Sequence, residues 1–312
     1  MIPPPQPSPD QARREFLENL SELGKGVSLY NNVDTTSPPS NFRFVNESLL
    51  GPGVMRATKD FMSGCKCRKD NGRNVGCEYL SCECLDDSAL NAEGRRVFPY
   101  SASKSDFGCL RGFYLENRHH IYECNDLCNC ESNCKNRVVQ HGRTILLQIF
   151  KTKNRGWGLR AMQDLKKGQF VDTYRGEIIT NEEANQRSKS RTVDQEIYLM
   201  DLDKWTEEDG AAQYVCDGMH VGGPTRFINH SCDPNCAIYT VSYNHADISI
   251  YDLAFFSTEF IPKGTELTFD YVGEEDHTPI TEKRADELEK EKGYRPAKCL
   301  CGTDVCRGYF FN

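Results

Sequence analysis

Nine of the sixteen cysteines occur in closely spaced groups between residues 65 and 134, and they are the first candidates for chemistry. Zinc in proteins takes four tetrahedral ligands. Two independent sites would use eight thiolates and leave one of the nine without a role. The same nine can bind three ions if three sulfurs each bridge two metals, which the repeated Cys-x-Cys pairs favour. We therefore predict a three-zinc cluster, with disulfides or free thiols as the alternative, formed by Cys65, Cys67, Cys77, Cys82, Cys84, Cys124, Cys128, Cys130 and Cys134.

A second group near the C-terminus supplies only three ligands, Cys299, Cys301 and Cys306. A catalytic zinc would take water as its fourth ligand, but no His, Asp or Glu nearby is placed as a general base. A fourth cysteine is the better explanation, and the candidates are Cys216, Cys232 and Cys236. We favour Cys232, because the polar turn that contains it can reach outward. The other two, with Cys109, are then expected to be plain buried or mobile residues.

Four short motifs combine polar and aromatic residues, namely Gly156-Trp157-Gly158, Asp172-Thr173-Tyr174-Arg175-Gly176-Glu177, Arg226-Phe227-Ile228-Asn229-His230-Ser231-Cys232 and Glu266-Leu267-Thr268-Phe269-Asp270-Tyr271. A nucleophilic Cys232 activated by His230 is the obvious first idea. However, neighbours on an extended chain point in opposite directions, and the predicted zinc site uses that sulfur. The Gly-Trp-Gly motif lacks the third glycine and following helix of a dinucleotide site. No single motif identifies a function.

The elements that must position these motifs are mostly short strands between about 139 and 275. We predict strands over Thr144–Phe150, Gln169–Ile179, Ile197–Leu202, Cys236–Tyr243, Ile250–Ser257 and Glu266–Val272. Thr180 and Glu183 form a capping box that predicts one helix after Ile179. Helices do not alternate with strands, so a doubly wound parallel sheet is excluded.

The flanking regions differ in composition from this β-rich part. An amphipathic helix is predicted over Asp10–Leu23, with Phe16, Leu17, Leu20 and Leu23 on one face. Residues 61–138 have few apolar runs, so metal should replace a core there. Residues 274–298 are highly charged and predict a mobile or weakly helical linker.

The composition limits the functional classes. The chain has 312 residues, 38% of them apolar, and a formal charge of −8. No apolar run reaches the roughly 18 residues that a membrane helix needs, and the proline-rich start lacks a secretory signal. We expect a soluble protein that stays inside the cell, where dense cysteines more often bind metal than form disulfides. The acidity argues against strong nucleic-acid binding and suits a basic peptide partner. The alternative is that it only confers solubility.

Taken together, the ordered motifs closely resemble the SET-domain lysine methyltransferases, over roughly residues 60–312. The cysteines on both sides make the chain similar to the Su(var) group, which acts on lysine 9 of histone H3. The resemblance implies a mainly β, irregular α+β fold of short sheets with a pseudo-knot, flanked by a triangular zinc cluster and a small C-terminal zinc site. It divides the chain into an N-terminal segment (1–60), a pre-SET cluster (61–138), a SET catalytic domain (139–275), a charged linker (276–298) and a post-SET segment (299–312).

The resemblance also implies roles for individual residues. Tyr174 and Tyr271 would orient the substrate amine, and Tyr198 would help to close the site. Phe269 would leave room for di- and trimethyl products, where a tyrosine would hold a water. S-adenosylmethionine would be held by Arg155, Gly156, Trp157, Tyr198, Arg226, Asn229 and His230. Asn229 and His230 would belong to the pseudo-knotted crossing.

The substrate and the C-terminal segment complete this expectation. A histone tail would add as a strand beside residues 198–202, with Asp201 and Asp203 facing basic tail residues or solvent. Zinc bound by Cys232, Cys299, Cys301 and Cys306 would fold the tail over the active site. Tyr309, Phe310 and Phe311 would then wall the channel. We expect a nuclear, chromatin-bound monomer without strong DNA binding, working with a separate methyl-lysine reader.

Three other interpretations stay open at this point. The chain could methylate another histone lysine or a non-histone protein. It could be a chromatin-binding SET protein without catalysis, although the intact tyrosines and Asn229-His230 argue against this. It could also be a zinc-structured interaction module, which would leave those residues unexplained.

Overall fold

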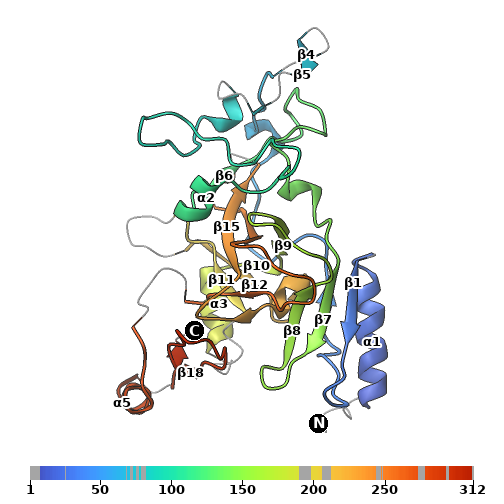
Figure 1. Cartoon of the computed structure of the whole chain (residues 1–312), viewed down its shortest axis with the longest axis vertical. Coiled ribbons are helices and arrows are strands. Elements are labelled where there is room, and N and C mark those ends of the chain that lie inside the picture. Colours follow the sequence, from blue (N-terminus) through green and yellow to red (C-terminus); the bar gives the residue numbers. More distant parts are fainter. Residues whose placement is uncertain are drawn as a thin grey trace.

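The computed structural model describes residues 8–24, 26–67, 69–70, 73–74, 77–78, 82–189, 198–205, 212–243, 247, 249–272, 278–292 and 295–310. Short strands dominate, as predicted (Figure 1). No helix in these ranges is long and apolar enough to cross a membrane.

The central sheet has the strand order β6-β15-β16-β9. Its strands are β6 (Ile121–Tyr122), β15 (Cys236–Ser242), β16 (Asp252–Ser257) and β9 (Phe170–Tyr174). β16 pairs antiparallel with both β15 and β9, and its phenylalanines Phe255 and Phe256 are fully buried. All five residues of β9 are buried, so this strand is fixed in the core up to its last residue, Tyr174.

A second sheet, in the order β1-β7-β8, contains β1 (Val27–Tyr30), β7 (Leu147–Lys151) and β8 (Trp157–Ala161). The turn between β7 and β8 is held by Thr152, whose hydroxyl accepts the Arg155 N–H at 2.8 Å and donates to the Gly156 carbonyl at 3.0 Å. Gly156 has φ of +66°, a conformation that side chains disfavour. The glycine therefore serves the turn itself.

A third sheet, in the order β11-β12-β10-β3, contains β11 (Leu199–Asp201), β12 (Tyr214–Asp217), β10 (Glu177–Thr180) and β3 (Leu49–Leu50). The predicted helix follows β10 as α3 (Asn181–Ser188), and the Thr180 hydroxyl accepts the Glu183 N–H at 3.2 Å. β11 forms an edge of this sheet, because it pairs only with β12 among the described strands.

The N-terminal arm, which we define as α1 to β3, is built into the body of the molecule. It begins with α1 (Pro9–Ser21), capped by Ser8, and includes β2 (Arg43–Phe44). Its three strands pair in parallel with β7, with β13 (Val221–Gly222) and with β10. The predicted helix is confirmed, but the prediction for Leu17 is wrong. Its side chain is 41% exposed, because α1 contacts the body along a narrower stripe that includes Phe16 and Leu20.

The cysteine-rich region occupies the upper end of the molecule in Figure 1. It contains η1 (Lys59–Phe61), β4 (Lys69–Asp70), β5 (Arg73–Asn74), η2 (Glu83–Leu85) and α2 (Gly112–Asn117). The sequence predicts that metal replaces a core in this region, but the structure contains an apolar core as well. The cysteines belong to a buried cluster that also contains Phe98, Tyr100 and Tyr114, and this cluster continues into β9, β15 and β16. The large aromatic side chains, although isolated in the sequence, converge there.

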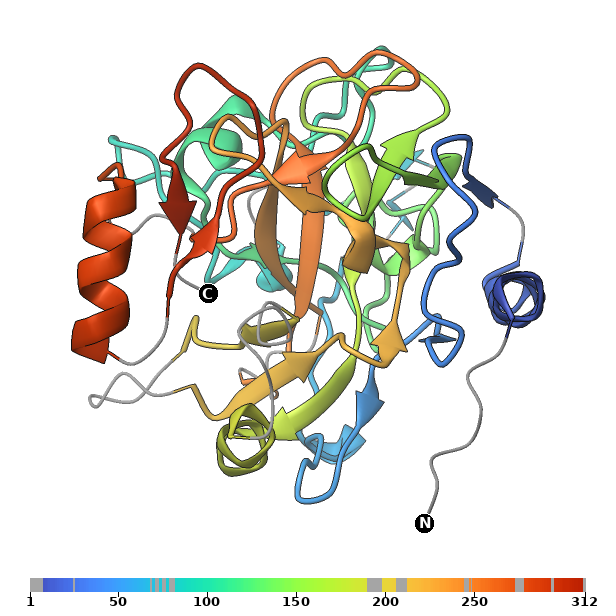
Figure 2. The same cartoon turned by 90° about the horizontal axis from the view of Figure 1, so that it is seen from below.

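The charged segment near the C-terminus forms a helix, the second of the two states that its composition predicted. α5 (Glu282–Lys292) buries Ala285 and Leu288, and β18 (Ala297–Lys298) pairs antiparallel with β19 (Tyr309–Phe310). Figure 2 shows α5 and α1 on opposite sides of the sheets. The remaining elements are η3 (Val139–His141), η4 (Pro224–Phe227), β14 (Asn229–His230) and β17 (Thr268–Phe269).

Candidate active site and metal centres

Two motifs that lie far apart in the sequence meet in the pair of β14 and β17. The strands are parallel, with Asn229 opposite Thr268 and His230 opposite Phe269. The Ser231 N–H then donates to the Phe269 carbonyl at 3.0 Å. This pairing explains why the sequence contains a polar Asn-His pair directly after an apolar run. The two residues form an interior strand that places the polar turn beside the end of β17.

Tyr271 follows β17 and is fixed at both ends. Its hydroxyl donates to the Ile228 carbonyl at 2.8 Å, and its backbone N–H donates to Nδ1 of His230 at 3.1 Å. Burial raises the pKa of the Tyr271 hydroxyl above its ordinary value, so the phenol stays protonated at physiological pH. Because the hydroxyl proton is used in the bond to Ile228, the oxygen lone pairs remain available as acceptors.

Tyr174 approaches the same place from the end of β9. Its hydroxyl donates to the Tyr198 carbonyl at 3.0 Å. Burial raises its pKa well above the ordinary value, and Cys216, Tyr271 and Tyr198 add to this effect. Gly218 makes room for the hydroxyl, since a Cβ at that position would lie 2.3 Å from the oxygen. Tyr174, Tyr198 and Tyr271 thus share one buried neighbourhood.

Phe269 forms an apolar wall beside these hydroxyls. Its ring centroid lies 4.6 Å from that of Tyr271 and 5.1 Å from that of Phe255. The side chain is buried and carries no polar group that could bind a water. An apolar surface therefore adjoins two fixed hydroxyl groups.

Arg226 and Tyr198 stack on each other. The guanidinium carbon lies 4.1 Å from the Tyr198 ring centroid, a distance typical of a cation–π contact. Its Nε donates to the Gly218 carbonyl at 3.0 Å. The backbone around Gly218 therefore positions both Arg226 and the hydroxyl of Tyr174.

Glu266 connects the other predicted cofactor residues, a role that the sequence did not predict. Its carboxylate accepts from the Asn229 side chain at 2.8 Å and from the Arg155 guanidinium at 2.5 Å. Asn229 also donates to the Trp157 carbonyl at 3.3 Å. Glu266 begins the motif that ends at Tyr271, and its alternation with apolar residues was the only signal present in the sequence. The structure thus brings Arg155, Trp157 and Asn229 together around one carboxylate.

His230 links this site to the C-terminal cysteines. Burial lowers its pKa to about 4, so the ring is neutral at physiological pH. Nδ1 accepts the Tyr271 N–H, and Nε2 lies 3.5 Å from the guanidinium of Arg307. Nε2 lies 3.3 Å from the sulfur of Cys232. Phe310 packs on the ring with a centroid distance of 4.5 Å.

The structure places the sulfur of Cys232, the predicted fourth ligand of the C-terminal metal site, beside those of the other three cysteines. The sulfurs of Cys232, Cys299, Cys301 and Cys306 all lie within 4.8 Å of one another. The Cys232 and Cys299 sulfurs are 3.7 Å apart, and zinc–sulfur bonds of about 2.3 Å in a tetrahedron place sulfurs roughly 3.8 Å apart. The four thiols therefore fit one zinc ion. Cys109, Cys216 and Cys236 are buried elsewhere.

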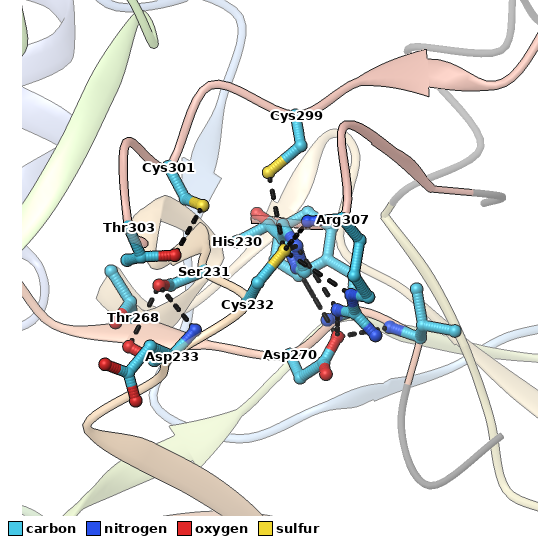
Figure 3. A network of polar contacts seen from close by, with 12 residues as sticks. His230, Ser231, Cys232, Asp233, Thr268, Asp270, Cys299, Cys301, Thr303 and Arg307 are labelled. Atoms are coloured by element: carbon cyan, nitrogen blue, oxygen red, sulfur yellow. Dashed lines mark hydrogen bonds and ion pairs between the residues drawn. The ribbon is translucent and has the colours of Figure 1, made fainter. Parts of the chain in front are cut away.

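Arg307 and Asp270 join this metal site to the active site, and sequence reasoning missed both (Figure 3). The guanidinium donates to the Asp270 carboxylate at 2.5 Å, and the backbone N–H and Nε of Arg307 each lie 3.4 Å from the Cys232 sulfur. Both side chains of the ion pair are at most 10% exposed. Asp270 directly precedes Tyr271, so the contact reaches the catalytic candidate through one peptide bond.

The aromatic tail divides between two surroundings. Phe310 contacts His230 and lies 5.9 Å from the Tyr271 ring, as a wall of the site should. Tyr309 instead bonds to Glu282 of α5 and packs under Arg295. Neighbouring residues of a strand face opposite ways, which accounts for the difference. Phe311 lies outside the described residues.

The cysteine-rich region also fits its predicted ions. Its sulfurs form three overlapping groups, each within 4.8 Å, and Cys124 belongs to all three. Contacts of 3.7 Å between Cys65 and Cys77 and 3.4 Å between Cys84 and Cys128 are close to the spacing in a zinc tetrahedron. Cys67 lies against Cys82, Cys65 and Cys77. All nine predicted cysteines therefore belong to one sulfur cluster.

A cavity of about 880 Å³ lies away from these residues. It is lined by both charge types, including Arg143 and Arg175, which both pair with the buried Asp172. None of the predicted catalytic or cofactor residues contributes to its wall.

Two family profiles match the chain. One, described as SET domain, covers residues 156–272, and the other, described as Pre-SET motif, covers residues 20–137. Among curated relatives, the histone-lysine N-methyltransferase, H3 lysine-9 specific dim-5 of Neurospora crassa is 42% identical over 91% of this chain and 88% of its own length. The histone-lysine N-methyltransferase Su(var)3-9 of Drosophila melanogaster is 36% identical over 95% of this chain, which spans 43% of that protein.

Solved structures show the same similarity. The structure of the Neurospora SET domain protein DIM-5, a histone lysine methyltransferase, superposes with a TM-score of 0.73 at 44% identity, over 80% of this chain and 96% of that one. The structure of Arabidopsis thaliana SUVH6 in complex with SAM gives a TM-score of 0.65 at 26% identity, over 99% of this chain and 60% of that one.

Proposed function

The chain belongs to the SET-domain histone-lysine N-methyltransferases of the Su(var) group, and on this premise we propose that it di- and trimethylates lysine 9 of the histone H3 tail. One observation carries the chemical part of the proposal. The hydroxyls of Tyr174 and Tyr271 are fixed by backbone carbonyls beside the apolar ring of Phe269. Such a site can hold an uncharged amine in one orientation.

S-adenosylmethionine, when bound, supplies an electrophilic methyl group on a sulfonium. The protein must deliver a neutral amine to it, although a free lysine has a pKa near 10.4. The buried, apolar wall at Phe269 disfavours the ammonium form by desolvation. The raised pKa values of Tyr174 and Tyr271 make phenolate bases unavailable, so the two tyrosines act as acceptors and orienting groups. Alignment of this kind can contribute about 7–11 kcal/mol.

The residues proposed to bind the cofactor include those that gather around the Glu266 carboxylate. Arg155, Gly156 and Trp157 lie at the β7–β8 turn, and Asn229 and His230 lie on β14, which the Asn229–Trp157 contact joins to that turn. Arg226 and Tyr198 stack next to Tyr174. We assign the binding of S-adenosylmethionine to these seven residues. The donors and rings that gather beside this turn and β14 support the assignment.

The peptide is assigned to the free edge of β11. An edge strand presents unpaired backbone groups that an extended peptide can pair with. Tyr198 directly precedes this strand, so a lysine on the added peptide would be delivered next to the Tyr174 hydroxyl. Desolvation and the neighbouring charge of Asp203 raise the pKa of the Asp201 carboxyl. The two carboxyl groups give this edge a local excess of negative charge. A basic tail would relieve that excess.

Four zinc ions complete the proposal. Three would occupy the sulfur cluster of the pre-SET region, and the overlap of the groups favours Cys65, Cys77 and Cys124 as bridges. Cys67 would then complete the ion between Cys65, Cys77 and Cys82. The fourth ion would take Cys232 with the three C-terminal cysteines.

The remaining parts of the proposal concern the cell and the domain organisation. A histone substrate places the protein in the nucleus, on chromatin, with a role in heterochromatin. A formal charge of −8 supports a monomer that meets the histone tail and does not bind DNA strongly, with a separate methyl-lysine reader. We retain the division at residues 60, 138, 275 and 298.

The test is methyl transfer to histone-tail peptides. Peptides covering the H3 N-terminus, with lysine 9 intact or replaced by arginine, are incubated with the protein and S-adenosylmethionine and analysed by mass spectrometry. We expect di- and trimethylation that disappears when lysine 9 is replaced. Transfer that persists after the replacement would assign another lysine, and cofactor binding without any transfer would support a non-catalytic role.

A further inference from the structure

The guanidinium of Arg226 is enclosed by aromatic rings from two parts of the chain. Its central carbon lies 4.1 Å from the ring of Tyr198 and 4.8 Å from the ring of Phe42. Phe227 is a third neighbour at 5.1 Å. In the plane of the group, Nε and an Nη donate to the carbonyls of Gly218 and Met219. The aromatic rings and the two hydrogen bonds therefore restrict the movement of the guanidinium.

Phe42 belongs to the N-terminal arm, far from the other residues in sequence. Its side chain is fully buried. The arm is held here by backbone bonds, from Arg43 N–H to the His220 carbonyl at 2.8 Å and from Val45 N–H to the Gly222 carbonyl at 3.0 Å. A Cβ on Gly222 would lie 2.5 Å from the Arg175 carbonyl oxygen and 3.3 Å from the Phe42 ring, so the glycine permits the close packing of both. The arm thus delivers one ring to a fixed place.

Arg226 contacts Tyr198, which in turn positions the hydroxyl of Tyr174. Its partner Tyr198 accepts the hydroxyl bond of Tyr174 through its carbonyl. A displaced guanidinium would release the Tyr198 ring and weaken the placement of that hydroxyl. A ring face attracts a cation by about 0.5–2 kcal/mol, the larger value applying to desolvated sites.

The simpler explanation is that Phe42 only fills the core. Phe44, two residues later, allows the two explanations to be separated. It is equally buried and packs on the same neighbours, with centroid distances of 4.9 Å to Phe42 and 6.4 Å to Phe227. Among the described contacts, however, the guanidinium of Arg226 meets the ring of Phe42 and not that of Phe44.

We propose that Phe42 is a positioning residue of the active site, which acts through Arg226 and Tyr198 and makes the N-terminal arm part of the cofactor-binding machinery. The inference rests on the proposed roles of Arg226 and Tyr198 in binding S-adenosylmethionine. It gives the arm a function beyond that of a structural cover.

The experiment compares Phe42→Leu with the matched control Phe44→Leu. Calorimetry measures the Kd for S-adenosylmethionine, thermal unfolding measures stability, and zinc content is counted in both. We expect similar losses of Tm and unchanged zinc. The Kd should rise about two- to thirtyfold for Phe42→Leu, as loss of a cation–π contact implies, and less than about twofold for Phe44→Leu.

A second variant covers the case in which Phe42→Leu does not fold. Trifluorophenylalanine at position 42 keeps the shape of the ring and weakens the attraction of its face for a cation, so the Kd should again rise while the Tm is kept. Equal shifts of Kd for the two leucine variants, or no shift with the fluorinated ring, would overturn the inference. Failure of the unmodified protein to bind S-adenosylmethionine would instead refute the proposed function.

Discussion

The two cysteine regions suit the same metal but relate differently to the chemistry. In the pre-SET cluster seven of the nine cysteines are buried, and they share a core with aromatic residues at the upper end of the molecule (Figure 1). In the C-terminal site only Cys299 is buried, and Cys232 comes from the turn that follows β14. The first group of sulfurs lies within a buried core, whereas the second joins the C-terminal segment to the turn after β14.

The difference shows that coordination chemistry alone does not assign a role to a metal. Similar thiols can stabilise a remote region or assemble an active site, depending on which elements supply them. Here the contact of Arg307 with Asp270 connects the C-terminal site to Tyr271. Among the described contacts, none joins the sulfurs of the pre-SET cluster to Tyr174 or Tyr271.

Cys124→Ser should have the largest effect. Its sulfur belongs to all three groups of the cluster, so its loss should release up to three ions and unfold the pre-SET region. Zinc counting should fall from about four ions toward one, with a large loss of thermal stability. Cys109→Ser is the matched control, because Cys109 is buried and lies within residues 61–138 but belongs to none of the sulfur groups. Equal behaviour of the two variants would contradict a shared bridging role.

A chelator should separate the two regions by rate. The C-terminal cysteines are more exposed, so one ion should leave first, and activity should fall about a hundredfold or more while most of the thermal stability remains. The release of zinc is followed with a colorimetric chelator alongside methyl transfer. If activity is lost only when the three pre-SET ions leave, the expectation is wrong, because methyl transfer would then depend on the pre-SET cluster.

Arg307→Met should uncouple the C-terminal site without emptying it. Loss of one partner of a buried ion pair costs about 3–5 kcal/mol in general, so stability and kcat should both fall, while zinc content stays at four. Arg295→Met is the control, because Arg295 pairs with exposed acids of α5 and packs on Tyr309, but among the described contacts it does not pair with Asp270. A double variant with Asp270→Asn measures the coupling. Additive losses in that cycle would argue against a direct link.

Phe269→Tyr should change the product and leave both metal regions intact. A hydroxyl beside Tyr271 can bind a water that occupies the space of further methyl groups. We expect mass spectrometry to show a shift from di- and trimethyl toward monomethyl peptide, with unchanged zinc. A native protein that makes only monomethyl product would refute the role given to Phe269.

The smallest effect should come from pH in the alkaline range. Burial raises the pKa values of Tyr174 and Tyr271, so the folded protein keeps these protons after the unfolded chain has lost them. The stability that they contribute is complete below the ordinary value of about 10 and is lost as pH rises beyond it. Methyl transfer should therefore not decline between about pH 8 and 9.5. A decline of methyl transfer in that interval that fits one ionisation would contradict this expectation. If cofactor binding declines likewise in the native protein but not in Tyr271→Phe, the ionising group is the phenol of Tyr271.

Local patterns in the sequence predicted much of this structure. The capping box predicted α3, short β-type runs between turn signals predicted β9, β15 and β16, and the spacing of the cysteines predicted both sulfur groups. Predictions failed where one segment depends on a distant one. Leu17 is exposed because the body covers only part of α1. Within the predicted strand Glu266–Val272, only Thr268 and Phe269 pair with β14, and Glu266 forms a single bridge with Arg160 of β8.

The residue types of the site were thus determined by the sequence alone, because thiolates, phenols and an Asn-His pair at these spacings permit few kinds of chemistry. The tertiary structure decided which of them meet. Glu266, Asp270 and Arg307 gave no separate signal, since a charged residue acquires a role only when burial removes water and leaves it a single partner. The same holds for Phe42, an ordinary apolar residue until the fold places its ring against Arg226.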